Sequence, residues 1–171
     1  MTITPARART IAITLVAGAM LAATPSAAQA AKPFRFPGDP TPVVVVFGKD
    51  GPVDPCGFPI EATITSREAV TFFSSGSVLV AGTYKVSMKN PANGKVLAIN
   101  ASGPGRIDAA GNFSGTGPQV YFLGADEAFG GGIYLFHGNT AFSRDDHGLV
   151  TTITWRGDKS GNLCAELAGG S

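Results

Sequence analysis

The sequence predicts an all-β domain, most simply an antiparallel up-and-down barrel of about eight strands, with a β-sandwich as the alternative. Apolar and polar residues alternate with a period of two along most of the chain after residue 58, as in half-buried strands. Short segments rich in Gly, Asn and Asp separate these stretches and are typical of tight turns. Helical periodicity is nearly absent, and barrel closure would remove the sheet edges that invite aggregation.

The expected strands follow one another at short intervals. The turn signal at residues 90–94 predicts that the stretches on either side of it form a hairpin. Only one helical turn is expected, around residues 164–167. The expected strands cover residues 58–65, 69–74, 77–89, 95–101, 119–123, 133–142 and 149–156, with a further short strand at Phe113.

Residues 1–30 have the pattern of a secretory signal peptide. Arg7 and Arg9 form a positive n-region, an apolar stretch covers residues 11–23, and small residues follow up to Ala30. The apolar stretch is shorter than the about 20 residues that a membrane span needs. We therefore expect a cleaved signal, a secreted extracellular protein, and no transmembrane segment after cleavage.

After the signal, the chain divides into a proline-rich arm over residues 31–55 and a single β domain over residues 56–171. Proline fixes φ and removes a backbone donor, so the arm is expected to be extended and to lie outside a central sheet. One apolar run within the arm, residues 43–47, is expected to be a short strand docked on the domain.

Charge excludes some partners. The chain has 13 Lys and Arg residues and 12 Asp and Glu residues. The signal carries Arg7 and Arg9 and no acidic residue, so the net charge after its removal is about −1. Nothing in this composition attracts nucleic acid or an anionic membrane.

The two cysteines, Cys56 and Cys164, enclose nearly all of the expected strands. In an exported chain two cysteines most simply pair, and neither has a histidine or another cysteine nearby that would make it reactive. We expect a disulfide with Cα atoms about 4.4–6.8 Å apart, which brings the first strand of the domain beside the C-terminal tail.

Turn glycines and the cysteine pair also make part of the chain resemble a group of known sequences. The motifs are Cys56-Gly-Phe-Pro59, Gly94-Lys95, Asn100-Ala-Ser-Gly-Pro-Gly105, Asp108 with Gly111, and Cys164-Ala-Glu-Leu167. Together they make residues 56–168 similar to a group of small secreted actinobacterial proteins of unknown function. The resemblance implies secretion and an all-β fold, and it carries over no activity and no catalytic residue.

No pattern of catalytic residues stands out. The densest polar cluster, residues 143–148, contains Ser, Asp and His, but neighbouring residues in a tight turn do not aim at one point as a triad does. With only two histidines, a tris-histidine zinc site is excluded. We expect no catalytic residue, metal site or cofactor. An acid–base enzyme, a hydrolase or an isomerase, remains an alternative if two of six residues meet in one cleft: Glu61, Asp126, His137, Asp145, Asp146 and His147.

Aromatic residues are the remaining candidates for a site. Several strands are apolar on both faces, whereas a simple core needs only one face. One explanation of the surplus is a second face that the proline-rich arm or the C-terminal tail covers. The other is a pocket or a surface patch for a small apolar ligand or a protein partner. The glycine-rich loop at residues 124–132 is expected to cover the mouth of the barrel. The candidate ligand-binding residues are Tyr121, Phe129, Tyr134, Phe136 and Trp155.

Trp155 is expected to point inward from the last long strand, where it either lines one end of a pocket or fills the core. The function that these observations favour is that of a secreted, non-enzymatic binding domain. A structural cell-surface protein is the other alternative to an enzyme.

Overall fold

A computed structural model describes residues 33–170 of the chain. The expected signal peptide, residues 1–30, lies outside this described part. The described chain is all-β and antiparallel, as predicted, with one nine-stranded sheet, a separate two-stranded hairpin and one short α-helix. The strands are β1 (Phe34–Phe36), β2 (Val43–Phe47), β3 (Ile60–Phe72), β4 (Val78–Lys89), β5 (Val96–Asn100), β6 (Gly105–Ile107), β7 (Phe113–Thr116), β8 (Gln119–Leu123), β9 (Gly132–Phe136), β10 (Asn139–Arg144) and β11 (Val150–Arg156).

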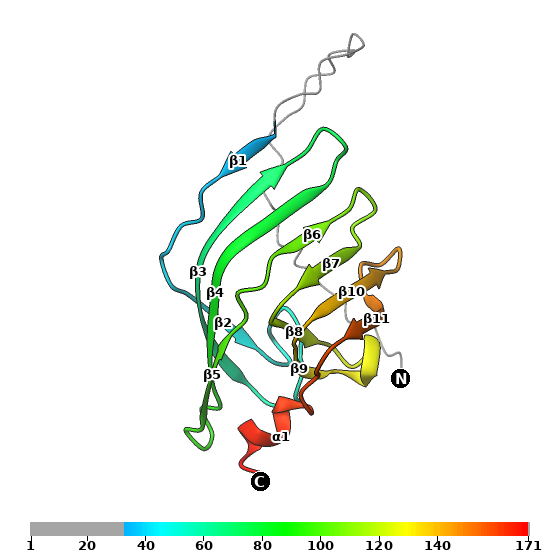
Figure 1. Cartoon of the computed structure of the whole chain (residues 1–171). Helices are drawn as coiled ribbons and strands as arrows, with labels where there is room; N and C mark the ends of the chain where they lie inside the picture. Colours follow the sequence, from blue (N-terminus) through cyan, green and yellow to red (C-terminus); the bar gives the residue numbers. More distant parts are fainter. Residues whose placement is uncertain (1–32, 171) are drawn as a thin grey trace, which may run out of the picture.

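The long hairpin β3–β4 forms the backbone of the large sheet. Figure 1 shows the two strands side by side along the length of the molecule, with α1 (Leu163–Ala168) at the lower end. The sequence predicted two strands, residues 58–65 and 69–74, where the structure has the single strand β3. The pairing of β3 with β4 continues without a register shift from Glu61 to Phe72, so there is no turn between the two expected strands; Glu68 pairs with Gly82. Gly82 has φ +148° and lies against the backbone of Arg67, so a side chain at this position would clash.

The sheet runs in the order β1-β3-β4-β6-β7-β10-β11, with β2 on β3 and β5 on β4. Within residues 33–170, β1 and β2 pair only with β3, and β11 pairs only with β10, so hydrogen bonds do not close the sheet into a barrel. Most neighbours along the chain pair as hairpins, as an up-and-down order predicts.

The hairpin β8–β9 leaves the large sheet and packs against one of its faces. Residues 133–142 were expected to form one strand, but the structure divides them into β9 and β10. The division falls at Gly138, which has φ +108° and packs against the carbonyl of Arg156, a close approach that only glycine permits. The chain therefore crosses from the hairpin to the sheet at this glycine.

Two apolar clusters fill the space between the hairpin and the sheet. The first joins the lower parts of β3 and β4 to α1 through Ile133 of β9. The second joins β9 to β11 and includes the fully buried Phe136. The face of the sheet that contacts the hairpin is called the inner face below, and the opposite one the outer face.

The proline-rich arm supplies the edge of the sheet. β1 pairs with the end of β3, and β2, the expected short strand, pairs with its beginning. Between them, residues 37–42 contain three prolines and interrupt the edge. Prolines and short edge strands limit pairing with other chains.

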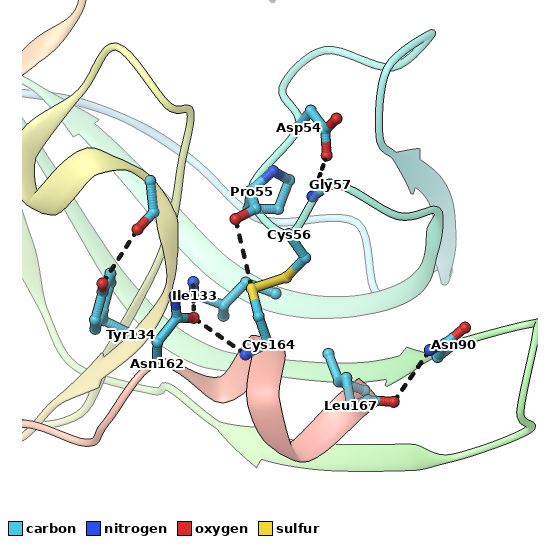
Figure 2. The surroundings of a disulfide bond; sticks show 11 residues. Asp54, Pro55, Cys56, Gly57, Asn90, Ile133, Tyr134, Asn162, Cys164 and Leu167 are labelled. Carbon is cyan, nitrogen blue, oxygen red and sulfur yellow. Dashed lines mark hydrogen bonds between the residues drawn. A yellow bond between two sulfur atoms is a disulfide. The ribbon is translucent and has the colours of Figure 1, made fainter. Parts of the chain in front are cut away.

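The disulfide joins Cys56, at the start of the β domain, to Cys164 of α1 in the C-terminal tail, as predicted. The Cα atoms of Cys56 and Cys164 lie 5.4 Å apart. Figure 2 shows that Asn162 caps α1, since its Oδ1 accepts hydrogen bonds from the backbone N–H groups of Cys164 and Ile133, each at 3.1 Å. At the other end of the helix, the amide of Asn90 donates to the carbonyl of Leu167 at 3.1 Å. A disulfide is consistent with an oxidising or extracellular location.

No helix in the described range is both long and apolar enough to span a lipid bilayer.

Candidate functional site

Four of the five predicted aromatic residues meet at one end of the space between hairpin and sheet. Phe129 comes from the short 3₁₀ turn η1 (Ala128–Gly130), Tyr134 and Phe136 come from β9, and Trp155 comes from β11. The ring centre of Phe129 lies 5.2 Å from that of Tyr134 and 5.9 Å from that of Trp155. Phe136 and Trp155 are 5.6 Å apart. We call these four residues the aromatic site.

The aromatic site has a buried floor and an exposed rim. Phe136 is fully buried and Tyr134 nearly so, whereas the side chains of Phe129 and Trp155 are 45% and 41% exposed. Trp155 does point toward the inner face, as predicted, but it does not fill the core. Its exposure follows from its place on β11, which has no pairing partner beyond β10 in the described chain.

The backbone of Phe129 is strained. Its φ of +64° places it in the left-handed region, and it is the only non-glycine residue with positive φ in the described part of the chain. For a bulky side chain this conformation costs on the order of 1–3 kcal/mol. The surrounding contacts therefore hold an exposed aromatic ring in place against a backbone preference.

Tyr121 lies behind the aromatic site. Its ring is 5.3 Å from that of Phe136, but its other aromatic contacts are Phe113 at 6.2 Å and Phe142 at 5.5 Å, on the sheet side. Its hydroxyl is buried and forms no hydrogen bond of ordinary geometry. Burial raises the pKa of this hydroxyl, and the nearby Thr140 hydroxyl offsets part of that rise. Tyr121 thus supports Phe136 from the core.

Lys159 borders the aromatic site, and it is not among the residues predicted from the sequence. Its Nζ lies 4.6 Å from the ring centre of Tyr134, 5.4 Å from that of Phe129 and 5.9 Å from that of Trp155. Each distance is within the range of a cation–π interaction. The ammonium also donates to the carbonyl of Ser160 at 3.1 Å. Within residues 33–170 it forms no ion pair with a carboxylate.

Backbone pairing fixes Lys159 at the rings. Lys159 forms an isolated bridge with Phe136 at the end of β9. On either side of it, the His137 N–H donates to the backbone carbonyl of Asp158 and the Ser160 N–H donates to the backbone carbonyl of Leu135, each at 2.8 Å. The chain after β11 therefore runs back along β9, which no alternation in the sequence indicates.

The loop that was expected to cover the barrel mouth is tied to the sheet by Glu127. One carboxylate oxygen of Glu127 accepts from the Gly124 N–H at 2.7 Å and the other accepts from the Val150 N–H at 2.9 Å. The hydroxyl of Tyr134 also donates to the Gly131 carbonyl at 3.1 Å. These bonds position η1, and with it Phe129, over the floor of the aromatic site.

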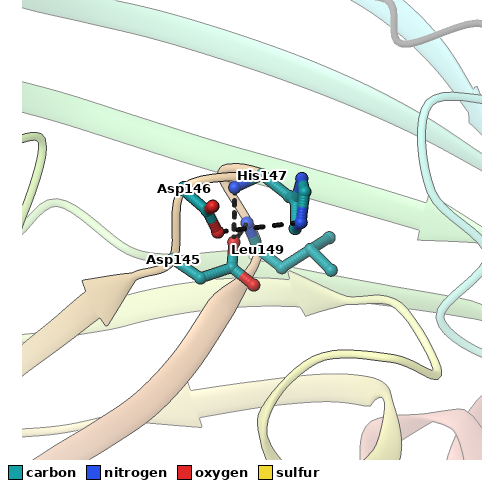
Figure 3. Close-up of polar contacts among 4 residues, drawn as sticks. All are labelled: Asp145, Asp146, His147 and Leu149. Carbon is teal, nitrogen blue, oxygen red and sulfur yellow. Dashed lines mark hydrogen bonds and ion pairs between the residues drawn. The ribbon is translucent and has the colours of Figure 1, made fainter.

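The polar cluster between β10 and β11 is a solvent-exposed turn (Figure 3). Asp145 Oδ1 accepts from the backbone N–H groups of His147 and Leu149 at 3.0 and 2.9 Å. His147 and Asp146 form an ion pair of 3.7 Å, with side chains 79% and 89% exposed. The carboxylate of Asp145 therefore stabilises the turn, as side chains of Asp commonly do.

One pair of the acid–base candidates shares a cleft. Asp126 and His147 both line an open hollow of about 850 Å³ that Tyr121 also borders. No hydrogen bond or ion pair joins Asp126 to His147 in the described chain, and Glu61 and His137 are exposed elsewhere. No group of three His, Cys, Asp or Glu residues between positions 33 and 170 could hold a metal ion.

Comparison with known proteins identifies no relative. No protein-family model, no curated protein and no solved structure matches the chain.

Proposed function

We propose that this protein is a secreted, non-enzymatic binding domain that holds a small apolar ligand at the aromatic site. The pattern of residues 1–30 supports secretion, and the disulfide fits an oxidising location. We further infer that the fold is a barrel left open on one side, with the hairpin β8–β9 lining its interior.

The observation that carries the proposal is the pair of exposed rings above a buried floor. Exposed aromatic side chains next to one another favour a ligand, because water hydrates their faces poorly. Phe129 keeps its ring at this place despite a strained backbone, and such strain is concentrated at binding sites. A flat apolar molecule that contacts Phe129 and Trp155 would cover both.

Binding, and not acid–base catalysis, is proposed because no hydrogen bond or ion pair joins Asp126 to His147 within their shared cleft. A general base must lie within hydrogen-bond reach of the proton that it abstracts. Glu61 and His137 are exposed on separate elements. Asp145 and Asp146 lie with His147 in one turn, where the Asp145 carboxylate accepts hydrogen bonds from the turn backbone and the Asp146–His147 pair is solvent-exposed.

A neutral apolar dye tests the proposal. N-Phenyl-1-naphthylamine fluoresces strongly only when it leaves water, and Trp155 is the only tryptophan of the chain. Titration of the dye is expected to give saturable dye fluorescence together with quenching of Trp155. Phe129→Ala should weaken dye binding by about tenfold, the loss typical of a central aromatic contact.

Phe34→Ala is the matched control, because Phe34 is also an exposed aromatic residue but lies on β1. It should leave the affinity unchanged. Equal losses in Phe129→Ala and Phe34→Ala, with circular dichroism showing both variants folded, would mean nonspecific adsorption and overturn the proposal. So would the absence of saturable binding by the parent protein.

A further inference from the structure

A second hollow lies on the outer face of the sheet, away from the aromatic site. It is an open groove of about 680 Å³ over β4, β6, β7, β10 and β11. This volume is within the range of small-molecule sites. β11 borders both sites, and because successive side chains of a strand point to opposite faces, Thr154 and Arg156 face the groove while Trp155 faces the aromatic site.

The floor of the groove is one row of paired residues across the strands. Arg106 of β6 pairs with Ser114 of β7, which pairs with Ala141 of β10, which pairs with Thr154 of β11. After Arg106 the side chains of this row are small, so the row forms a depression. Asn139, in the neighbouring row, pairs with Arg156 and adds an amide.

Charge distinguishes this groove from the hollow beside Tyr121, whose lining includes Asp54, Asp126 and Glu127. The groove lining includes Arg106 and Arg156, and no described Asp or Glu side chain belongs to it. Neither guanidinium forms an ion pair in the described chain. Arg106 is held in place by a hydrogen bond to Ser77 Oγ at 2.8 Å and by the ring of Phe73 at 5.4 Å.

The two arginines lie at opposite ends of the groove. β6 and β11 are separated by three strand spacings, which corresponds to about 14 Å between backbones. Hydroxyl and amide side chains lie between them, each able to donate and to accept a hydrogen bond. The groove thus offers two sites for carboxylates, joined by partners for uncharged polar groups.

We propose that the groove binds a linear oligosaccharide that carries carboxylates. Arg106 and Arg156 would pair with the carboxylates, and Ser114, Asn139 and Thr154 would hydrogen-bond the sugar hydroxyls. Guanidinium groups bind carboxylates through two parallel hydrogen bonds, which makes such pairs specific as well as strong.

An acidic sugar fits the groove better than an acidic peptide. Peptides bind to sheets mainly by adding a strand at an edge, where free backbone groups pair with them. The groove lies on a face between β6 and β11, where β7 and β10 already have partners on both sides. Recognition there depends on side chains, whose hydroxyl and amide groups match sugar hydroxyls.

Calorimetric titration with hexagalacturonate tests the proposal, with maltohexaose as the neutral sugar of equal length and hexaglutamate as the acidic peptide. We expect binding of hexagalacturonate only, and weaker binding as sodium chloride is raised. Arg156→Gln should weaken it by about tenfold, since a charge-assisted contact is lost. Ala141→Phe should abolish it by filling the middle of the floor.

Arg35→Gln is the matched control, because Arg35 is an exposed arginine on β1, outside the groove. The Arg35→Gln variant should bind hexagalacturonate as the parent does. The Phe129→Ala variant should also bind it as the parent does, and this result separates the test of the groove from the test of the aromatic site. Circular dichroism establishes that each variant is folded. The proposal is overturned if the parent binds no hexagalacturonate, if maltohexaose or hexaglutamate binds as tightly, or if folded Ala141→Phe still binds.

Discussion

Glu68 is a half-buried acid on the inner face of β3, opposite Gly82 of β4. Its carboxylate accepts a hydrogen bond from Ser66 Oγ at 3.0 Å, but burial has the larger effect and raises its pKa. Burial and the nearby charge of Glu68 also raise the pKa of the Tyr84 hydroxyl. With Ser66, the two residues form a polar group on the inner face, which sequence analysis did not single out.

Glu68→Gln is expected to stabilise the protein at pH 7 and to have no such effect at pH 3. Because the folded pKa lies above the ordinary value of 4.5, ionisation of Glu68 opposes folding. This penalty is absent below pH 4.5, develops as pH rises toward the folded pKa, and is complete above it. Urea unfolding of variant and parent at both pH values measures the difference.

Asp39→Asn provides a control of opposite sign. Hydrogen bonds from Thr41 lower the pKa of Asp39 below its ordinary value of 3.8, so the ionised carboxylate favours folding. This contribution is fully present at pH values above 3.8, and it is lost as the pH falls through the lowered pKa. A Glu68→Gln difference that does not change between pH 3 and pH 7 would contradict the role given to burial.

Residue by residue, the aromatic site was partly predictable. Strands that are apolar on both faces pointed to Tyr134, Phe136 and Trp155, and the glycine-rich loop pointed to Phe129. Lys159 was not predictable, because it belongs to no alternating stretch and reaches the rings only through its bridge to Phe136, far away in sequence. The exposure of Trp155 depends on which strand ends the sheet, and alternation alone does not contain that information.

Among the elements, the loop that carries η1 depends most clearly on a single side chain. Glu127 bridges Gly124 in the loop to Val150 on β11. Removal of this carboxylate would separate the loop from the sheet and remove a support of Phe129.

Glu127→Ala should therefore destabilise the protein by about 2 kcal/mol, since two hydrogen bonds to a charged group are lost at a partly exposed position. Hydrogen exchange at the amides of Gly124 and Val150 should become faster, because both lose their acceptor. Asp126→Ala is the neighbouring control; its side chain is exposed, and it should change stability by less than about 0.5 kcal/mol. Unchanged exchange at Gly124 and Val150 in Glu127→Ala would refute this account of the loop.

Element boundaries depended on glycines more than alternation suggested. Where two strands were expected, residues 60–72 form one strand, because Gly82 on β4 has no side chain to clash with the backbone of Arg67 and Glu68. Residues 133–142 form two strands because Gly138 allows the chain to pass the carbonyl of Arg156. The type of each element was therefore predictable from its period, whereas its ends required knowledge of close backbone approaches.

On the scale of the whole molecule, the disulfide is the strongest single constraint. It closes a loop with a sequence separation of 108 residues. Replacement of Cys56 and Cys164 by serine should lower the free energy of unfolding by about 4–5 kcal/mol, because the unfolded chain gains conformational entropy. The fold should survive, since the two apolar clusters remain.

Urea unfolding of the double variant and the oxidised parent measures this loss, and reduced parent protein is the control that should resemble the variant. Mass spectrometry should find no free thiol in the protein after export. Two free thiols there, or equal stability of variant and oxidised parent, would contradict the prediction.

The all-β class was predictable because the alternation and the turn residues are local features of the sequence. The disulfide was predictable because the chain has two cysteines, which can pair in one way. The path of the sheet was not. Alternation shows which side chains share a face, but it does not show that β8 and β9 leave the sheet or that β1 and β11 stay unpaired with each other. These pairings join segments far apart in sequence, so they depend on the packing of the whole chain.

The covalent link between Cys56 and Cys164 also determines what a protease can release. Between these residues the chain is a closed ring, and β3 to β11 all belong to it. One cut in an exposed turn of the ring, such as residues 145–149, leaves the molecule in one piece, and two cuts are needed to excise a fragment. β1 and β2 precede the ring, so they are the only described strands that a single nick can detach.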